Sequence, residues 1–283
     1  MSDQTIGILH PGAMGVTVAS AARAAGHEVL WASDGRSSAT QSRAKEAGLR
    51  DVGNLEQLVR ESDVILSVCP PASAVTVANE VLRCGFRGTF VDANAVAPET
   101  ARSIDRTVGG AAVSFVDGGI VGPPAHRQGT TRLYLSGERA AQVGSLFEGS
   151  VLGTVVVNAV PGSASVLKMC YAAYTKGTAA LLIAIRGLAA AEGVESALLG
   201  EWALSQPDLE KRSEVTARAT APRAWRFVGE MQEIASTFEA RGLPGDFHTG
   251  AAKIYGALSR FKDCEEPPSL ASILRALAGD GAS

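Results

Sequence analysis

Short apolar runs alternate with helical stretches through the first half of the chain. The run at 64–68 is apolar at nearly every position, which is typical of a strand buried on both faces of a parallel sheet. A repeated order of strand and helix predicts a doubly wound α/β sheet with right-handed crossovers. The strands are expected at residues 5–9, 28–32, 64–68, 89–92, 113–117, 132–135 and 154–157.

Capping residues support the helices between these strands. Asn54, with Gln57 three residues later, predicts the start of a short helix. Pro98 suits the first position of another helix, because its missing N–H is not needed there. The other helices of this half are expected at 16–25, after the turn at 33–38 as far as about residue 47, and at 74–82.

The pattern changes at Pro161 and Gly162, after which no strand is expected. We therefore predict two domains, an α/β domain at residues 1–161 and an all-helical domain at residues 162–283. The helices of the second domain are expected at 163–193, 196–205, 212–219, 223–241, 250–261 and 269–278.

The helix at 163–193 is apolar nearly all round and carries few charges. Such a helix needs burial on more than one side, which one small domain can hardly supply. We expect a homodimer in which this helix packs against the partner subunit through the C-terminal helical domain. A single larger core is the alternative.

The first fifteen residues have the order strand, glycine turn, helix, with which a dinucleotide-binding unit begins. A glycine lets the backbone approach a pyrophosphate closely, and free N–H groups at the helix start attract its charge. The first glycine place of the G-x-G-x-x-G pattern is taken by a histidine, so the pattern is imperfect. The cofactor-binding candidates in this turn are His10, Pro11, Gly12, Ala13, Met14 and Gly15.

The end of the second strand predicts a preference for NADP(H), with NAD(H) as the alternative. The acidic residue that binds the ribose hydroxyls is expected there, but Ser33 holds that place. Arg36 with Ser37 and Ser38 suits a 2′-phosphate, because a guanidinium pairs with phosphate in a forked geometry. The alternative is that Asp34 turns inward and binds the ribose while Arg36 is solvated.

Composition narrows the class of protein. The chain has 283 residues, 46% of them apolar and 19% charged, with a net charge of −3, and no block of like charges suggests nucleic acid or an anionic membrane surface. The four cysteines lack the spacing of a disulfide framework or a metal site, so we expect no metal. The longest apolar run, 178–185, stops at Arg186 and is too short to span a bilayer. A cytoplasmic location is expected.

Three further motifs follow the glycine turn along the chain, and their order is more specific than any one of them. They are the segment Asp117-Gly118-Gly119-Ile120-Val121-Gly122, then Gln128-Gly129-Thr130, and then Gly162 followed six residues later by Lys168. Together with the glycine turn, this order resembles the β-hydroxyacid dehydrogenase family, which includes 3-hydroxyisobutyrate and 6-phosphogluconate dehydrogenases and has the imine reductases as relatives. The resemblance covers the whole chain and implies an NAD(P)-binding Rossmann-type domain followed by a helical domain.

The resemblance also implies roles for individual residues. Gly12 and Gly15 would contact the pyrophosphate. The loop of Cys69 and Pro70, together with Asn94, would lie beside the nicotinamide. The catalytic lysine would be Lys168, and the substrate-binding places would be Gly119, Val121, Gly122 and Pro123.

Departures from the family pattern affect the expected substrate. Gly119, Val121 and Pro123 stand where the family has Pro, Ser and Gly, and Tyr171 stands where its catalytic motif has Asn. The resemblance therefore implies an oxidoreductase that acts on a small hydroxy acid or a related carbonyl compound, with reduction of a C=N bond as the alternative. A nucleotide-binding sensor without catalysis is a further alternative.

Hydride transfer to a carbonyl carbon needs a group that gives or takes a proton at the oxygen. A lysine that enters an apolar helix is desolvated, which favours acid/base chemistry, so Lys168 is the candidate. A snorkelling surface lysine is the alternative. Tyr171 lies near the same helix face and could share the donor role, although it could equally be a packed ring.

Glu230 is a candidate sensor of substrate charge. It flanks the apolar stripe of the helix expected at 223–241 and takes the place of a family lysine that reaches toward the nicotinamide. A carboxylate there would favour a cationic substrate. The alternative is a solvated glutamate paired with Arg226.

Overall fold

The structure is a computed structural model that describes residues 4–262, 264 and 266–278. The chain forms two compact units, Met1–Met169 and Cys170–Ser283. Their division falls inside one long helix, α7 (Ser163–Ala191), which contributes residues to both. The domain boundary predicted between residues 161 and 162 lies at the start of this helix.

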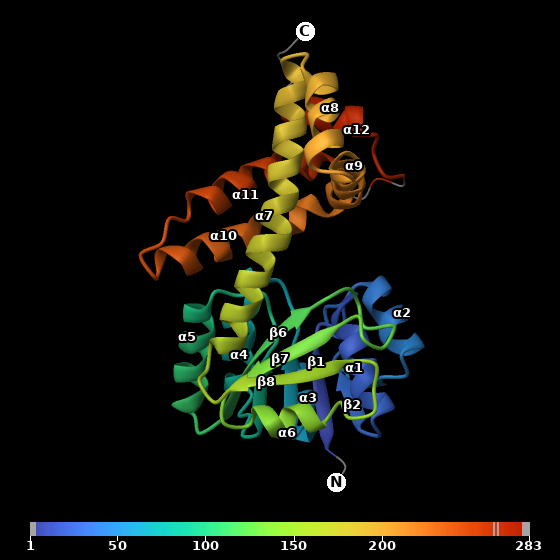
Figure 1. The fold of residues 1–283 in the computed structure, drawn as a ribbon. Helices are drawn as coiled ribbons and strands as arrows, with labels where there is room; N and C mark the ends of the chain where they lie inside the picture. Colours follow the sequence, from blue (N-terminus) through green and yellow to red (C-terminus); the bar gives the residue numbers. More distant parts are fainter. Residues whose placement is uncertain (1–3, 263, 265, 279–283) are drawn as a thin grey trace. The chain divides into compact units, whose positions relative to one another are not determined.

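The first unit contains an eight-stranded sheet in the order β3-β2-β1-β4-β5-β6-β7-β8 (Figure 1). All neighbouring strands are parallel except β6 and β7, which are antiparallel. The doubly wound α/β sheet predicted from the sequence is thereby confirmed. The strands are β1 (Thr5–Leu9), β2 (Glu28–Trp31), β3 (Arg50–Asp51), β4 (Val64–Ser67), β5 (Thr89–Asp92), β6 (Ser114–Val121), β7 (Arg132–Ser136) and β8 (Gly153–Asn158).

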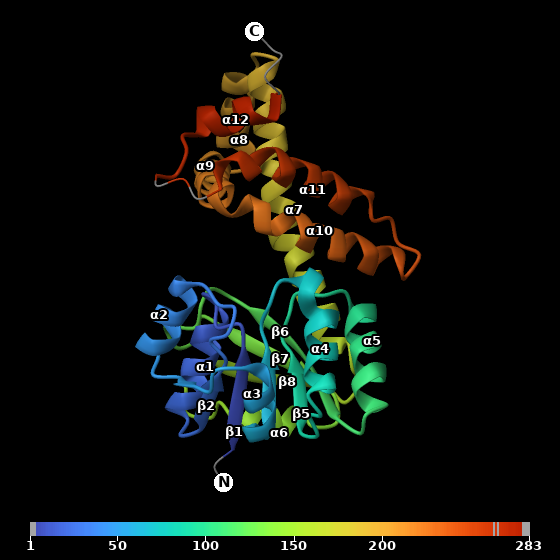
Figure 2. The ribbon, with the colours of Figure 1, turned by 180° about the vertical axis from the view of Figure 1, so that it is seen from behind.

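Helices cover both faces of the sheet and enclose two apolar cores. One core includes buried residues of α1 and α6, and the other includes buried residues of α3, α4 and α5 (Figures 1 and 2). The helices of this unit are α1 (Gly15–Ala24), α2 (Ser38–Glu46), α3 (Leu55–Glu61), α4 (Ala74–Arg83), α5 (Pro98–Gly109) and α6 (Ala140–Ser145), with a 3-10 turn η1 (Pro71–Ser73).

The order of the strands creates a switch point between β1 and β4. From β1 the chain moves outward through β2 and β3, and it then returns to the other side of β1 as β4. Crevices at the carboxyl ends of strands at such a point are where open α/β sheets bind ligands. The turn after β1 and the loop after β4 therefore border the expected binding crevice.

The local signals for helix starts are confirmed. The Asn54 side chain accepts a hydrogen bond from Gln57 N at 2.9 Å, and Pro98 is the first residue of α5. The strand expected at 113–117 is longer than predicted, because β6 continues to Val121 while it pairs with β7. The short helix α6 was not anticipated.

In its described residues the second unit contains helices and no strand, as predicted. It contains the remainder of α7 with α8 (Glu195–Ser205), α9 (Leu209–Thr220), α10 (Ala224–Glu239), α11 (Asp246–Leu258) and α12 (Leu270–Ala278), and the 3-10 turns η2 (Ala221–Arg223) and η3 (Ser259–Phe261). Helices α10 and α11 lie side by side (Figures 1 and 2). None of the helices in the described ranges is long and apolar enough to cross a lipid bilayer.

Polar contacts tie three other helices to α7 within this unit. Buried Arg186 donates to Glu195 Oε1 of α8 at 2.7 Å and to Ser213 Oγ of α9 at 2.8 Å. The Tyr255 hydroxyl of α11 donates to the Lys176 carbonyl oxygen at 2.6 Å. Helix α7 is therefore the scaffold of the second unit.

Candidate active site

The turn after β1 has the backbone geometry of a glycine-rich phosphate turn. His10 has a φ of 62°, a left-handed conformation that glycine adopts without strain, so this histidine occupies a place shaped for the missing first glycine. Gly12 N donates to the His10 carbonyl oxygen at 2.6 Å. A Cβ on Gly15 would lie 2.8 Å from that same oxygen, so only glycine fits where α1 begins. Pro11, Ala13 and Met14 complete the turn.

A hollow of about 170 Å³ lies beside this turn within the first unit. Its walls come from β1, the loop after β2, the start of α3 and one face of α4. It brings together His10 and Arg36, two of the predicted cofactor residues, with the carboxylates of Asp34 and Glu80. The lining residues are Ile8, Leu9, His10, Ala32, Asp34, Arg36, Leu55, Val77, Glu80 and Val81.

His10 is uncharged at neutral pH. Burial, together with the positive charge of the Arg36 guanidinium, lowers its pKa to about 4. Its Nδ1 atom is buried and has no hydrogen-bond partner in the protein. A buried polar atom without a partner is unusual in a protein, and this one belongs to a residue that lines the hollow.

The other residues predicted at the end of β2 are used in local structure. Ser33 N donates to Asp51 Oδ1 at 3.2 Å, and the Ser33 carbonyl oxygen accepts from Arg36 N at 3.0 Å, which closes the turn. The Ser37 hydroxyl accepts from Thr40 N and caps α2. Of the residues predicted to bind the 2′-phosphate, Arg36 is the one that lines the hollow.

Asn94 holds the loop that follows β4. Its Oδ1 accepts from Cys69 N at 2.5 Å, while its Nδ2 donates to Ser67 Oγ at 3.1 Å and to Asp92 Oδ2 at 2.8 Å. The side chain is 3% exposed, and both of its amide hydrogens are used inside the protein. Asn94 therefore fixes the backbone of Cys69, directly before Pro70.

Two ionisable groups in this loop region have raised pKa values. Burial raises the pKa of the Cys69 thiol to about 11, so the thiol stays protonated at neutral pH and is a poor nucleophile. Burial, together with the nearby Asp117, raises the pKa of Asp92 to about 7, against the hydrogen bonds from Asn94. Asp92 was not among the sequence candidates.

Lys168 lies against the carboxyl end of β6. Its Nζ donates to the Ile120 carbonyl oxygen at 2.6 Å, and the residue is partly buried. Because β1, β4, β5 and β6 are parallel, this end of β6 lies at the same edge of the sheet as the turn after β1 and the loop after β4. The structure thus places the predicted lysine at the edge that carries the predicted cofactor loops.

The predicted substrate segment is part strand and part loop. Gly119 and Val121 lie inside β6, which continues beyond residue 117, where the strand was expected to end. A Cβ on Gly119 would lie 3.0 Å from Lys168 Cβ and 2.8 Å from the Ala164 carbonyl oxygen, so this glycine lets α7 pack directly on β6. Val121 is 2% exposed, whereas Gly122 and Pro123 are exposed in the loop that follows.

The candidates in the second unit are Tyr171 and Glu230. Tyr171 is one turn beyond Lys168 along α7 and is 48% exposed. Glu230 of α10 forms an ion pair with Lys176 of α7, at 2.9 Å between Oε1 and Nζ, and the two side chains are only 12% and 18% exposed. Because the Glu230 side chain is largely buried, the solvated glutamate considered from the sequence is wrong.

Sequence reasoning missed the buried polar groups behind the lysine. Asp117 was noted only as part of a motif, yet with Ser136 and Ser165 it forms a hydrogen-bonded cluster at the start of α7. A charged residue ending an apolar strand was the available signal. In the ranges that the structure describes, no three His, Cys, Asp or Glu side chains are grouped as metal ligands are.

Two family models match parts of the chain. Residues 1–78 match the NAD-binding domain of D-isomer specific 2-hydroxyacid dehydrogenases, and residues 189–258 match a domain of unknown function, DUF1932. An uncharacterized 28.5 kDa protein of Methanothermus fervidus is 31% identical over 172 residues. That alignment spans 61% of this chain and 66% of the relative, just under two thirds of its length.

Solved structures match over nearly the whole chain. A conserved protein of unknown function, described as similar in structure to 3-hydroxyacid dehydrogenases, is 27% identical with a TM-score of 0.69, covering 91% of this chain and 97% of that one. The 3-hydroxyisobutyrate dehydrogenase of Mycobacterium tuberculosis, solved with L-serine, is 16% identical with a TM-score of 0.71, covering 98% and 99%. A reductive aminase of Aspergillus terreus, in complex with NADPH and ethyl levulinate, is 15% identical with a TM-score of 0.58, covering 98% and 100%.

The chain has the fold of the β-hydroxyacid dehydrogenases. The resemblance seen in its motifs is thereby confirmed at the level of the fold, and residues 1–78 match an NAD-binding domain of dehydrogenases. In this β-hydroxyacid dehydrogenase fold, the glycine turn, the loop after β4 and the lysine lie at one edge of one sheet.

Asp92→Asn should flatten the dependence of the free energy of unfolding on pH. The pKa of folded Asp92, about 7, lies above that of an unfolded aspartate, so the folded state binds the proton more tightly. This contribution is complete below about pH 4 and is lost as pH rises through about 7, with an upper limit of a few kcal/mol at ~1.4 kcal/mol per pKa unit. Urea unfolding across this pH range measures it.

The matched control for this experiment is Asp208→Asn. Asp208 is exposed, and asparagine tolerates its left-handed backbone, so this variant should keep the wild-type slope of stability against pH. Identical slopes for wild type and Asp92→Asn would contradict the raised pKa.

Proposed function

We propose that this protein transfers a hydride between NADP(H) and a small hydroxy acid or a related carbonyl compound, with Lys168 as the general acid/base. The observation that carries the proposal is the position of the Lys168 amine, held by the Ile120 carbonyl oxygen at the sheet edge that also carries the glycine turn. An amine at a ligand-binding edge suits proton transfer better than a lysine on an open surface.

When bound, the nicotinamide supplies or accepts the hydride. In the reductive direction, Lys168 Nζ gives a proton to the substrate oxygen and is reprotonated from solvent. In the oxidative direction, the neutral amine takes the hydroxyl proton. The ammonium form also stabilises negative charge that develops on the oxygen.

The chain's own residues fit a dinucleotide. The tight turn of His10, Gly12 and Gly15 leads into the start of α1, whose first N–H groups have no partner within the helix and suit a pyrophosphate. The adjoining hollow is lined by apolar side chains together with polar ones, His10 and Arg36 among them, and we assign it to the adenosine half. We assign the loop of Cys69 and Pro70 to the nicotinamide half, with Asn94 holding that loop from behind.

We assign the preference for NADP(H) to Arg36, because it lines the hollow and its positive charge reaches His10. Asp34 lines the same hollow, and its carboxylate would favour the ribose hydroxyls of NAD(H) instead. The two neighbouring side chains thus favour different cofactors, and single substitutions separate them.

The residues at the predicted substrate-binding places do not favour a standard hydroxy acid of the family as the substrate. Gly119 packs against α7 and Val121 is buried, so of the predicted substrate places Gly122 and Pro123 are accessible. Tyr171, in the place of the family asparagine, is a second proton donor and supports imine reduction as the alternative chemistry. The Glu230–Lys176 ion pair is neutral as a whole and supports no selection for a cation.

We further propose a homodimer that packs through α7. Its large apolar side chains Tyr171, Tyr174, Leu181 and Leu188 are 45–68% exposed, and the last three are seven residues apart. That spacing places them on one seam, as in helices that pack along a partner helix. A second copy brings the same seam, so a two-fold axis makes the surface self-complementary.

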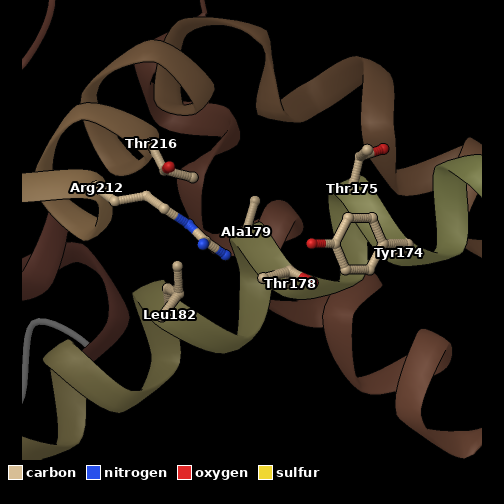
Figure 3. Close-up of a pocket in the computed structure, with 7 residues that line it drawn as sticks. All are labelled: Tyr174, Thr175, Thr178, Ala179, Leu182, Arg212 and Thr216. Atoms are coloured by element: carbon tan, nitrogen blue, oxygen red, sulfur yellow. The ribbon is translucent and has the colours of Figure 1, made fainter. Parts of the chain in front are cut away.

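A hollow of about 230 Å³ between α7 and α9 adjoins this seam. Figure 3 shows the Arg212 guanidinium pointing from α9 toward α7, with Tyr174 among the lining residues. The hollow gives the partner's side chains a place to insert. It is lined by Tyr174, Thr175, Thr178, Ala179, Leu182, Arg212 and Thr216.

Lys168→Met should lower kcat by on the order of a hundredfold or more, because one acid/base group contributes on that scale. Cofactor affinity should be retained. A panel of ketoacids, hydroxy acids, aldehydes and imines, followed at the NADPH absorbance, identifies the substrate class and measures turnover. Lys253→Met, which removes an exposed lysine of α11, is the matched control. Near-normal turnover of Lys168→Met would overturn the assignment, with Tyr171 the next candidate.

Arg36→Ala should weaken NADPH binding by about tenfold or more and leave NADH binding nearly unchanged, since charge-assisted hydrogen bonds to a 2′-phosphate contribute on that scale. Asp34→Asn, its neighbour in the hollow, should not weaken NADPH binding. Dissociation constants for both cofactors, measured by fluorescence titration, give the ratio. A ratio that Arg36→Ala leaves unchanged would contradict this preference.

Leu181→Asp with Leu188→Asp should convert the wild-type dimer into a monomer, because two carboxylates would be buried in the seam. Light scattering after size-exclusion chromatography measures the mass. Leu204→Asp, on the 83% exposed Leu204 of α8, is the control and should stay dimeric. A monomeric wild type would rule out the proposed interface.

A further inference from the structure

A row of buried polar side chains crosses the sheet behind Lys168. Ser67 of β4, Asp92 of β5, Asp117 of β6 and Ser136 of β7 are paired in register from strand to strand. All four are at most 1% exposed. Side chains at paired positions lie on the same face of a sheet, so the row is continuous.

At one end of the row, Asp117 holds the first turn of α7. Asp117 Oδ2 accepts from Ser136 Oγ at 2.8 Å and from Ser165 N at 3.0 Å, and Oδ1 accepts from Ser165 Oγ at 2.5 Å. Ser136 Oγ in turn accepts from Ala164 N at 3.1 Å. The carboxyl group accepts three hydrogen bonds from these donors, as an ionised carboxylate does.

This contact meets two physical needs of the helix. The first N–H groups of a helix have no partner within it, and buried ones must find partners elsewhere. A negative charge at the N-terminus also opposes the positive end of the helix dipole. Asp117 supplies both, from a strand that also carries the acceptor of the lysine, Ile120.

The geometry points to Asp117 as a positioning residue for Lys168, an inference that rests on the proposed role of that lysine. Strand β6 holds α7 at Ser165, leaves room for it at Gly119, and accepts from the Lys168 amine at Ile120. Asp117 fixes the position and rotation of α7 relative to β6, and it thereby fixes the position of the Lys168 amine. Because Asp117 is fully buried, it acts through the helix and not by contact with a ligand.

The first measurement does not depend on a substrate. Protein labelled with ¹³C at the lysine ε-carbons is titrated by NMR, with the Lys168 signal identified by its loss in Lys168→Met. In Asp117→Asn the Lys168 signal should move, and its titration midpoint should fall by a few tenths of a pH unit because a nearby negative charge is lost. The charged groups around Asp117 are Asp92 of β5, which the variant keeps, and Lys168 of α7. The paired residue of β7, Ser136, is uncharged.

The second measurement is kinetic. Asp117→Asn should lower kcat about tenfold, with the dissociation constant of NADPH unchanged. Ser165→Ala removes one hydrogen bond and keeps the carboxylate, so it should show a smaller fall and keeps the test open if Asp117→Asn does not fold. Val108→Ala, on the buried face of α5, is a destabilising control that should change neither the lysine signal nor kcat.

The outcomes separate this inference from the proposed function. A Lys168 signal and midpoint identical to wild type in both Asp117→Asn and Ser165→Ala would overturn it, as would the same changes in Val108→Ala. Full turnover in Lys168→Met refutes the acid/base role instead, and in that case the NMR result still decides whether Asp117 places the amine.

Discussion

The first unit depends on a buried row of polar side chains that must be satisfied within the sheet. Ser67, Asp92, Asp117 and Ser136 lie at one register across four strands, where no water reaches them. Each buried polar group without a partner destabilises a fold by about 1–3 kcal/mol, so these side chains need hydrogen-bond partners from the segments around them. Asn94 supplies hydrogen bonds on one side, and the start of α7 supplies them on the other.

This requirement explains why the candidate site is assembled at one edge. On one side Asn94 satisfies Asp92 and fixes the backbone of Cys69. On the other, Asp117 and Ser136 satisfy the first N–H groups of α7. The reversed direction of β7 places Ser136 opposite Asp117, so the one antiparallel pair of the sheet supports the start of the helix. Burial of polar groups thus positions the loop after β4 and the lysine together.

The fold was predictable because its local signals agree with one another. Apolar runs, the Asn54 cap, Pro98 and the glycine turn each lie where a strand, helix start or turn was predicted. His10 is an informative exception, since its residue type conceals a left-handed position that only the backbone reveals. Lys168 could be proposed from its motif, but its acceptor, Ile120, lies 48 residues away and depends on the packing of α7 on β6.

The sequence by itself determined the order of strands and helices and the change near residue 162 from alternating strands and helices to helices alone. It also identified Lys168 as the acid/base candidate, because periodicity, capping and motif spacing are local. Tertiary structure decided which polar groups meet. It extended β6 through Gly119 and Val121, gave Glu230 the partner Lys176, and raised the pKa of Asp92 through burial. These properties depend on strand register and desolvation, which arise only when distant segments pack together.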